Sequence, residues 1–585
     1  MKKQKTSQKT QKHFNDLLLP IVLILCFLPF LVYMAEYDYG YNDYLWHSDN
    51  SVLQDFYTYY RSICFLIIVF FLVVILAFRL SLYKEDTKDF KLFFPLIGYG
   101  CFVLLSSIFS MNPKAAWLGN FCELEGAFVL LGYCLVAFYT YQIMKKTDYE
   151  TIARAIRVMF VLISIVGWFQ VFKHDLLNYE WVQKIVMSDY FFEEYGGMVE
   201  DVFTGNNVFL TLYNPNYAAV FLVMFSCVFF IFTIYAKDLK NRILNGLLLS
   251  DALILCWFTY TRAALVSVVV VLAVFITILI QKKQKSIFKY MFPSILSLFA
   301  LLFIIDYAMG GKFIGRLVDE EKSTSLEQIL TTERGVEITY ESETYILSFS
   351  DDNTSVCLTD CSGNDILAAQ TSSGEMQLPF AANAYATVTD WDGYTMMLVY
   401  LENTTLQFIE EDGIYYYYTD WGKIDSMVEI PHIDFNGLES LGSGRIYIWS
   451  RILPMLKNYI FIGSGPDTFA EVYPQNDYVG KMIYAENPGR IMERAHNDYL
   501  MRWVQTGLLS LVCLLIFYGM FFKKCLPYYR ASSLESTDSQ LGFGCLLGCI
   551  GYLVCCFFSD STVYTTPVFY VFIGLALAAA YKEQS

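Results

Sequence analysis

Long runs of apolar residues recur along this chain and predict helices that cross a membrane. A helix rises about 1.5 Å per residue, so roughly 20 apolar residues span the hydrocarbon core of a bilayer. The connections 260–263 and 560–563 are so short that each predicts a tight helical hairpin. The pattern predicts an α-helical polytopic membrane protein with about 12 transmembrane helices. The runs are 16–35, 62–80, 92–110, 126–144, 154–172, 216–235, 243–260, 264–281, 287–306, 499–522, 541–559 and 564–581.

Lysine and arginine in the short connections predict the orientation of these helices. Basic residues in short loops favour the cytoplasmic side of the membrane. Those of the intervening loops are few, namely Arg61, Lys114 and Arg262. We therefore expect both termini in the cytoplasm and the intervening loops outside. The basic residues gather in alternate connections, at 2–12, 79–88, 145–146, 237–242, 282–285 and 523–530.

Two longer polar segments separate the apolar runs on the outer side. The first, 173–212, is aromatic and acidic, and the second, 307–496, is long enough to hold a domain. Within the second, residues 335–423 alternate apolar and polar positions in short runs, split by turn-rich pieces such as 351–353. Alternation with a period of two is typical of half-buried strands. We expect a small all-β insertion, similar to a β-sandwich, outside the membrane.

These patterns divide the chain into three domains. We expect an N-terminal membrane domain with nine transmembrane helices over 1–306 and a C-terminal one with three over 499–585. Residues 307–498 between them form an extracytoplasmic loop. This loop holds the β-rich insertion at about 320–435 and a catalytic loop at about 437–498.

The composition also indicates a membrane protein. Hydrophobic residues make up 56% of the 585 residues and charged ones 17%, with a mean hydropathy of +0.41. The net charge of −16 has to be divided between the two sides of the membrane, so it predicts no nucleic-acid partner. Most of the 15 cysteines lie inside apolar runs, and without CxxC or Cys/His spacing the sequence predicts no metal and no cofactor. Cys357 and Cys361 lie in the insertion, where an oxidising exterior permits a disulfide but their close spacing leaves the bond open.

Three outward-facing basic residues are candidates for chemistry. His496 lies where the long polar segment gives way to an apolar run. Because the unperturbed pKa of histidine is near neutral, an imidazole at this boundary is a candidate general base. Arg262 occupies a tight turn between two apolar runs, and Arg445 precedes the glycine-containing stretch 463–467. Guanidinium groups fork two donors onto phosphate oxygens, so the arginines together could clamp a diphosphate; each alone could equally anchor the interface.

Several short blocks of sequence carry a family resemblance. They are 212–217 (Leu-Tyr-Asn-Pro-Asn-Tyr), 259–264, 443–449 with 463–469, 495–500 with Gly507, and a weaker block made of 117–119 and 125–126. In their order and their placement in the predicted topology, they resemble the O-antigen ligase and polymerase family of bacterial membrane glycosyltransferases. The resemblance covers most of 90–306 and 437–580. The β-rich insertion departs from the shorter loop usual in the family.

The resemblance implies a GT-C-like fold and a function. It implies transfer of a glycan from an undecaprenyl-diphosphate carrier to an acceptor on the outer face of the bacterial cytoplasmic membrane, without a metal and with inversion at the sugar. Arg262 and Arg445 would bind the donor diphosphate, and His496 would accept the proton of the attacking hydroxyl. The acceptor could be a lipid, a protein, the cell wall or a growing polysaccharide, so ligase and polymerase stay open. Candidate supporting residues in the same blocks are Asn214, Asn216, Asn497 and Tyr499.

Other interpretations remain at this point. A metal-dependent glycosyltransferase would use Glu36 and Asp38, but no second acidic cluster pairs with them, which favours a solvated loop. A transporter or flippase for polysaccharide or lipid-linked glycan also fits twelve spans, although charged or broken helices near the midplane are expected there. A sensor that binds its ligand through the insertion would leave the basic residues without a joint task. The aromatic stretches 190–195 and 415–418 could stack on sugars or simply pack.

Overall fold

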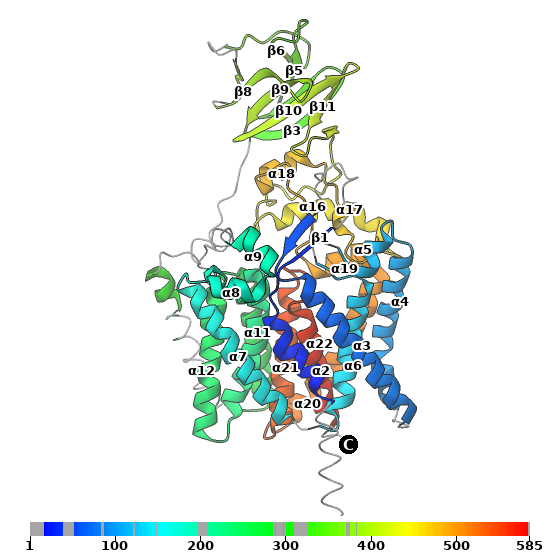
Figure 1. Ribbon diagram of the computed structural model, residues 1–585, viewed down its shortest axis with the longest axis vertical. Helices are drawn as coiled ribbons and strands as arrows, with labels where there is room; N and C mark the ends of the chain where they lie inside the picture. Colours follow the sequence, from blue (N-terminus) through cyan, green and yellow to red (C-terminus); the bar gives the residue numbers. More distant parts are fainter. Residues whose placement is uncertain are drawn as a thin grey trace, which may run out of the picture.

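A bundle of helices forms one end of the molecule and a β unit the other, with short helices between them (Figure 1). The computed structural model describes residues 17–38, 52–82, 87–120, 123–147, 149–196, 207–284, 287, 297, 300, 302–308, 325–369, 375–381 and 383–582. Within these residues, eight helices are long and apolar enough to cross a membrane. They are α3 (Tyr59–Leu82), α4 (Phe94–Ile108, which with the preceding turn gives the 19-residue span Phe90–Ile108), α6 (Ala127–Met144), α7 (Glu150–Val171), α11 (Pro215–Tyr235), α13 (Arg262–Gln281), α20 (Leu508–Ala531) and α21 (Thr537–Cys555). The prediction of a polytopic membrane protein is confirmed.

Three further predicted spans differ from these eight. Helix α22 (Thr566–Lys582) is apolar but only 17 residues long. Helix α12 (Leu239–Trp257) has the length of a span but carries three charged side chains, those of Lys240, Arg242 and Asp251. The predicted span 287–306 lies largely outside the described residues.

Two predicted spans are not continuous helices. The first apolar run, 16–35, is helical only over Leu19–Phe30 (α2, Leu19–Val22, then η1, Leu23–Phe27, and η2, Leu28–Phe30), because Pro29 stands in its last turn. The run 499–522 breaks at Gly507, whose φ of +92° ends α19 (Asp498–Thr506) before α20 begins. Helix α19 lies at the end of the bundle near the β unit, where its Asp498 and Arg502 side chains are paired with each other.

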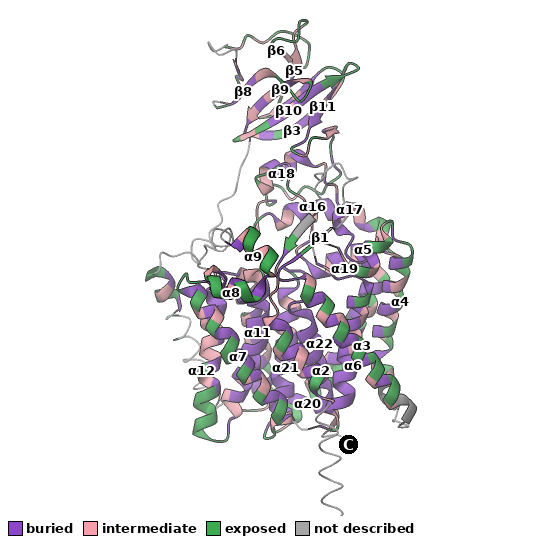
Figure 2. Cartoon of the chain, in the orientation of Figure 1, coloured by how far each residue is buried: buried purple, intermediate pink, exposed green. Residues whose placement is uncertain are grey.

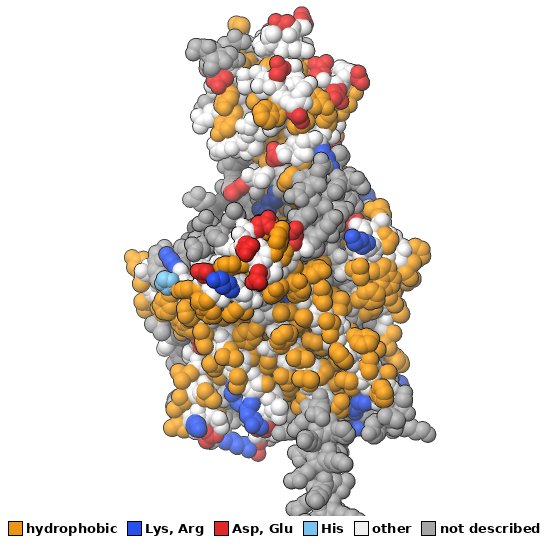
Figure 3. All heavy atoms as spheres, viewed as in Figure 1, with side chains coloured by type: hydrophobic (Ala, Val, Ile, Leu, Met, Phe, Trp, Pro, Cys, Tyr) orange, Lys and Arg blue, Asp and Glu red, His pale blue; other side chains and the backbone are white. Residues whose placement is uncertain are grey.

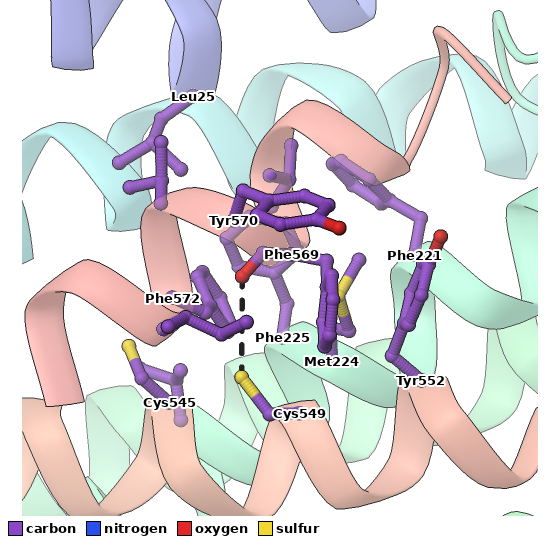
Figure 4. Close-up of a cluster of buried hydrophobic side chains, with 14 of the residues drawn as sticks. Leu25, Phe221, Met224, Phe225, Cys545, Cys549, Tyr552, Phe569, Tyr570 and Phe572 are labelled. Atoms are coloured by element: carbon purple, nitrogen blue, oxygen red, sulfur yellow. Dashed lines mark hydrogen bonds between the residues drawn. The ribbon is translucent and has the colours of Figure 1, made fainter. Parts of the chain in front are cut away.

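The centre of the bundle is built from α11, α21, α22 and α6, which pack against one another. Most of their residues are buried, whereas fewer than half of those of α3, α7 and α13 are; the exposed faces of α3 and α7 are visible in Figure 2. Figure 4 shows Phe225, Phe569 and Phe572 interlocking here, with the Cys549 thiol directed at the Phe569 carbonyl oxygen. Small residues permit this close approach. A Cβ at Gly544 would lie 2.7 Å from the Cα of Val228.

The surface of the bundle divides into zones that suit a membrane. On the face seen in Figure 3, a wide belt of hydrophobic side chains covers the bundle, and Lys and Arg side chains gather at the end opposite the β unit. This end holds the last turn of α6 and the connection between α11 and α12. The distribution follows the charge bias from which the orientation was predicted.

The β unit, residues 326–425, consists of two antiparallel sheets. One has the strand order β3-β4-β5-β6 and the other β12-β11-β10-β9-β8-β7. Alternate side chains of both sheets meet in one core that includes Ile338, Leu347, Val399 and Phe408. A small β region with a sandwich-like core is therefore present where the alternation predicted it. The strands are β3 (Leu326–Thr331), β4 (Val336–Tyr340), β5 (Glu343–Phe349), β6 (Val356–Asp360), β7 (Met376–Gln377), β8 (Tyr385–Trp391), β9 (Tyr394–Leu401), β10 (Thr404–Glu411), β11 (Ile414–Tyr418) and β12 (Ile424–Asp425).

Short elements lie between the bundle and the β unit and position the outer residues (Figure 1). Tyr478 and Met482 of α18 pack into the β core, so this helix joins the β unit to the outer region. A two-stranded ribbon, β1 (Ala35–Asp38) with β2 (Val52–Asp55), lies in the same layer. The other elements are α5 (Pro113–Leu118), α8 (Glu180–Val186), α9 (Asp189–Tyr195), α16 (Arg445–Met455), α17 (Phe469–Val472) and α18 (Tyr478–Ala485), with the 3-10 turns η3 (Thr87–Phe93), η4 (Leu176–Asn178) and η6 (Leu456–Tyr459).

Candidate active site

His496 is held by a buried carboxylate. Its Nδ1 lies 3.1 Å from Oδ2 of Asp560, whose side chain is 1% exposed, while the imidazole itself is 38% exposed. A carboxylate can only accept, so Nδ1 donates and the neutral ring keeps Nε2 as its acceptor. The Asn497 N–H donates to the other oxygen, Oδ1, at 3.2 Å. The contact orients the ring and leaves Nε2 outside the pair with Asp560.

The local backbone explains how these two residues meet. Asp560 lies in the short connection between α21 and α22, and His496 immediately precedes the N-cap of α19 with a φ of +50°. The Asp498 N–H donates to the carbonyl oxygens of Cys556 and Ser559, at 2.9 and 3.0 Å. The start of α19 is therefore fixed on the hairpin that carries Asp560.

The charge of Asp560 is balanced by several cations. Burial alone would raise the pKa of this carboxyl, but the hydrogen bond from His496 and the positive charge of its protonated form, together with the charges of Arg494 and Arg445, outweigh burial, and the pKa falls below its ordinary value. Asp560 is therefore an anion, and it faces His496, Arg494 and Arg445 at once. These side chains share one site.

Arg445 and Arg262 meet at one loop. Arg445 begins α16, and its Nη1 donates to the Gly442 carbonyl oxygen at 3.0 Å; its buried Nε has no hydrogen-bond partner among the described residues. Arg262 begins α13, and its Nη2 donates to Oγ of Ser443 at 3.1 Å. Burial lowers the pKa of Arg445, Asp560 opposes this, and the charge of Arg262 lowers it further. Two guanidinium groups that repel each other across a loop favour an anion between them.

Helix α16 connects Arg445 to the histidine. One turn after Arg445, the Trp449 indole N–H donates to the carbonyl oxygen of Ala495 at 2.8 Å. Further along, Nε of Arg451 pairs with Oδ2 of Asp477 at 2.7 Å, both side chains being at most 9% exposed. Asp477 is the N-cap of α18. Helix α16, which begins with Arg445, is therefore held at two points: by Ala495, next to His496, and by the start of α18.

Arg494 is a member of the site for which no role was predicted from the sequence. Its side chain is buried, with Nε 3.5 Å from Oε1 of Glu123, and it donates to the Tyr217 hydroxyl, over whose ring the guanidinium lies at 5.6 Å from the centroid. It therefore connects the start of the 495–500 block to Tyr217 of the 212–217 block. The only signal in the sequence was its place two residues before His496. Asp560 was missed in the same way: a lone acid between two apolar runs was the sole sign of it.

A second buried network supports the first. Glu125 accepts from Ser561 and pairs with Arg502 at 3.3 Å, and Arg502 also pairs with Asp498 at 3.1 Å. Asp467 accepts the backbone N–H groups of Asn120 and Glu125. Burial raises the pKa of Glu125, against the lowering effects of Arg502 and of hydrogen bonds from Ser561 and Tyr133. The weaker sequence block, 117–126, is thereby joined to the blocks that hold Asp467 and His496.

The four candidate supporting residues have identifiable contacts. Asn214 caps α11 by accepting the Asn216 N–H at 2.9 Å, and Asn216 accepts from Thr261, the neighbour of Arg262, at 3.3 Å. Asn497 caps α19 by accepting the Leu500 N–H at 3.0 Å. The Tyr499 hydroxyl donates to the Leu553 carbonyl oxygen at 2.8 Å, on the side of α21. The asparagines brace the turns that carry Arg262 and His496, and Tyr499 fixes α19 to the bundle.

Of the alternative acidic pair, Glu36 has no such surroundings, and the side chain of Asp38 lies outside the described part of the structure. Glu36 is exposed and lies in β1, where it pairs with Gln54 of β2. Among the described residues, no group of three His, Cys, Asp or Glu is placed to hold a metal ion. Cys357 and Cys361 are both free and exposed in the structure.

An apolar pocket lies beside the site on the bundle side. Its volume is about 650 Å³. Tyr499 and Phe558 belong to its lining and lie within three residues of His496 and Asp560, respectively. The full lining is Val274, Tyr499, Phe522, Leu526, Ile550, Leu553, Val554, Phe557 and Phe558. The pocket is suited to a hydrocarbon chain that reaches the charged site from the membrane.

The bundle and the charged site at the end that carries the β unit define a polytopic membrane protein with a polar, ion-paired site at one end of its helices. A family model described as O-Antigen ligase matches residues 395–515, from β9 through α16 and α19 into α20. This match confirms the resemblance to the O-antigen ligase and polymerase family and supports a membrane glycan ligase or polymerase kind of function. No curated protein sequence matches the chain. No solved structure matches it.

Proposed function

We propose that this protein transfers a glycan from an undecaprenyl-diphosphate carrier to a hydroxyl of an acceptor on the outer face of the bacterial cytoplasmic membrane. Both termini lie in the cytoplasm in this proposal, following the basic end of the bundle. The observation that carries it is the His496–Asp560 pair, whose carboxylate also faces Arg445 and Arg494. A base and several cations thus meet at one outer site.

The arginines bind the donor in this proposal. Arg445 and Arg262 contribute guanidinium groups on either side of the 442–445 loop, and Arg445 has a buried Nε without a partner among the described residues. A diphosphate would accept from both. Negative charge grows on the diphosphate as it departs, and preorganised cations in a partly dry site stabilise that charge. Leaving-group stabilisation is therefore assigned to arginine.

His496 is the general base in this proposal. Nε2 takes the proton of the acceptor hydroxyl while its oxygen attacks the anomeric carbon, and the bond from that carbon to the diphosphate oxygen breaks with its electron pair on the diphosphate. Attack from the opposite face inverts the sugar carbon. Asp560 keeps Nδ1 protonated and stabilises the imidazolium that forms.

The apolar pocket would take the first isoprene units of the carrier. Its lining reaches Tyr499 and Phe558, which flank the charged site in the sequence. A carrier bound here would place its diphosphate at the arginines and its tail in the bilayer. Donor and acceptor would then be held at one surface, which lowers the entropic cost of their reaction.

The test uses membranes that contain lipid-linked glycan and full-length protein. Conversion of the lipid-diphosphate glycan into a higher-mass conjugate is measured for His496→Ala and Arg445→Ala, with His432→Ala and Arg490→Ala as matched controls. His432 and Arg490 are exposed residues of the same outer region. We expect both site variants to be present at wild-type levels and inactive, and both controls to be active.

Two results would contradict the proposal. Full transfer by His496→Ala would reduce that residue to an interface anchor. A wild-type protein that moves the carrier lipid across reconstituted vesicles but never changes its glycan would be a flippase, the alternative that twelve spans also allow.

A further inference from the structure

The outward face of the six-stranded sheet is aromatic, although it does not face the core of the β unit. A sheet with one face in water usually places polar side chains on that face. Here the inward positions of β9, such as Met397 and Val399, fill the core, and the positions between them carry Tyr394, Leu398 and Tyr400. We call this surface the outer sheet face. Its aromatic residues are Tyr385, Trp391, Tyr394, Tyr400, Tyr416 and Tyr418.

Two pairs of rings on the outer sheet face are in contact, and every ring except that of the buried Tyr418 is partly or fully exposed. Tyr385 and Tyr400 stack with centroids 5.1 Å apart and planes 20° from parallel. Tyr394 and Tyr418 lie 5.8 Å apart, over the buried Met396 and Ile409. Trp391, at the tip of the β8–β9 hairpin, is 69% exposed. An exposed aromatic surface of this kind marks a binding site.

Polar groups are distributed among these rings. Thr387, Thr389 and Gln407 point to the same side, since they pair with outward residues of β9. Each tyrosine also adds a hydroxyl. A surface that alternates ring faces with hydroxyl and amide groups suits a ligand that is itself part apolar and part polar. A sugar ring has this character, with C–H groups on its faces and hydroxyl groups around its edge.

The net charge of the β unit indicates which charge the ligand carries. Residues 326–425 hold 18 Asp and Glu against 2 Lys and Arg, which is equal to the whole net charge of −16. Acidic side chains are scattered over the visible surface of the unit, where almost no basic ones are seen (Figure 3). The two hairpin tips beside the rings add five exposed carboxylates, those of Asp390, Asp392, Glu410, Glu411 and Asp412. Such a field repels anionic lipids and anionic glycans and attracts cations, which aromatic faces also bind.

We propose that the outer sheet face binds a glycan that carries free amino groups. The rings hold the sugar faces, and the surrounding carboxylates complement the ammonium groups. The choice of a glycan over a basic protein rests on the proposed function, because the neighbouring site would handle glycan chains. The face would then hold the acceptor or the growing product above the transfer site, to which α18 connects the β unit.

The experiment measures binding by the full-length protein in lipid nanodiscs, without any transfer. The probes are a glucosamine hexamer and its fully N-acetylated counterpart, in which an acetyl group on each nitrogen removes the positive charge. Trp391→Ala removes the most exposed ring, and Glu411→Gln removes a carboxylate of the same face. Tyr190→Ala on α9, where Tyr190 is 66% exposed, is the matched aromatic control.

We expect the glucosamine hexamer to bind the wild type about tenfold more tightly than the acetylated hexamer, and to lose about tenfold in affinity in Trp391→Ala. Glu411→Gln should lower the affinity for the glucosamine hexamer severalfold, and this loss should be smaller at high salt. Tyr190→Ala should bind the hexamer as the wild type does. Equal binding of both hexamers, or no effect of Trp391→Ala, would overturn the proposal. So would a lysine hexamer that displaces the glycan with equal or greater affinity, since the face would then be a docking site for a basic protein. Transfer activity is scored separately, so loss of binding with intact transfer removes this inference alone.

Discussion

The outer site and the β unit both contain many ionisable side chains, but they hold them differently. At the site, Asp560, Arg502 and Glu125 are buried and paired. In the β unit, the carboxylates far outnumber the bases and most are exposed, as at Asp351 and Asp412. Outside 326–425 the chain carries as many Lys and Arg as Asp and Glu. Charge is balanced where it is buried and left unbalanced where water screens it.

This difference teaches what each region is able to do. Burying a charge costs several kcal/mol unless it is paired, so each buried group at the site fixes the geometry of its partner. An exposed charge fixes no geometry, but it contributes to a field that selects ligands by sign. We therefore expect substitutions at the site to abolish transfer and substitutions in the β unit to change glycan affinity.

The largest effect should come from Asp560→Asn. An amide at this position can donate to Nδ1 of His496, which would leave the proton on Nε2 and the wrong nitrogen facing the acceptor. We expect the transfer rate to fall roughly 10²- to 10⁴-fold, as when a catalytic imidazole loses its orienting carboxylate. The rate of conjugate formation in membranes checks this, with the exposed Asp434→Asn as control. Retention of the wild-type rate would mean that Asp560 only shapes the hairpin.

Asp477→Asn tests the connection between the two regions. It removes the anion from the buried Arg451 pair and from the N-cap of α18, and leaves Arg451 buried without a counter-ion. We expect a loss of about 3–5 kcal/mol in the free energy of unfolding. Thermal unfolding in nanodiscs measures this. If the β unit were only appended to the bundle, the loss would stay below about 1 kcal/mol, the value of an exposed ion pair.

Arg494→Lys separates charge from geometry at the site. Lysine keeps the positive charge near Asp560 but loses the fork that reaches both Glu123 and Tyr217. We expect a roughly tenfold slower transfer with little change in the apparent affinity for the donor, on the order of the 1.4 kcal/mol that a tenfold rate represents. The split between kcat and KM is the measurement. A change in KM alone would place Arg494 with the donor-binding arginines instead.

Most of the helices could be predicted from the sequence, because a run of about 20 apolar residues is long enough to cross a bilayer as a helix. The prediction failed where hydropathy averaged over a long run did not reveal a helix end within that run. The run 499–522 contains Arg502 and Gln505, which are buried in α19 among paired polar groups, and Gly507 separates this helix from α20. Alternation likewise located the strands. The aromatic stretch 415–418, however, does not lie on one surface: Tyr415 and Tyr417 point into the core, and Tyr416 and Tyr418 point outward.

The site was predicted only in part, for a related reason. His496, Arg262 and Arg445 belong to short blocks whose resemblance could be recognised. Asp560 lies 64 residues from His496 in the sequence, and the residues next to Asp560 in the sequence do not indicate that His496 is its partner. Such pairs arise from the packing of α19 on the α21–α22 hairpin, which no local pattern encodes. The roles of these residues in transfer stay a proposal.

The smallest effect concerns Lys481, in α18 between the regions. Burial lowers the pKa of its ammonium group to about 8, despite the opposing charges of Asp477, Asp420 and Asp425. Between this value and the unfolded pKa of about 10.4, the unfolded chain binds the proton that the folded one has released, so stability rises with pH across that window. Lys481→Met should flatten the rise, by on the order of 1–2 kcal/mol between pH 8 and pH 10. Melting temperatures of both proteins across this range test it. An identical rise in the variant would mean that the charged ammonium is already solvated, and that α18 is held less tightly between the β unit and the site than its buried contacts indicate.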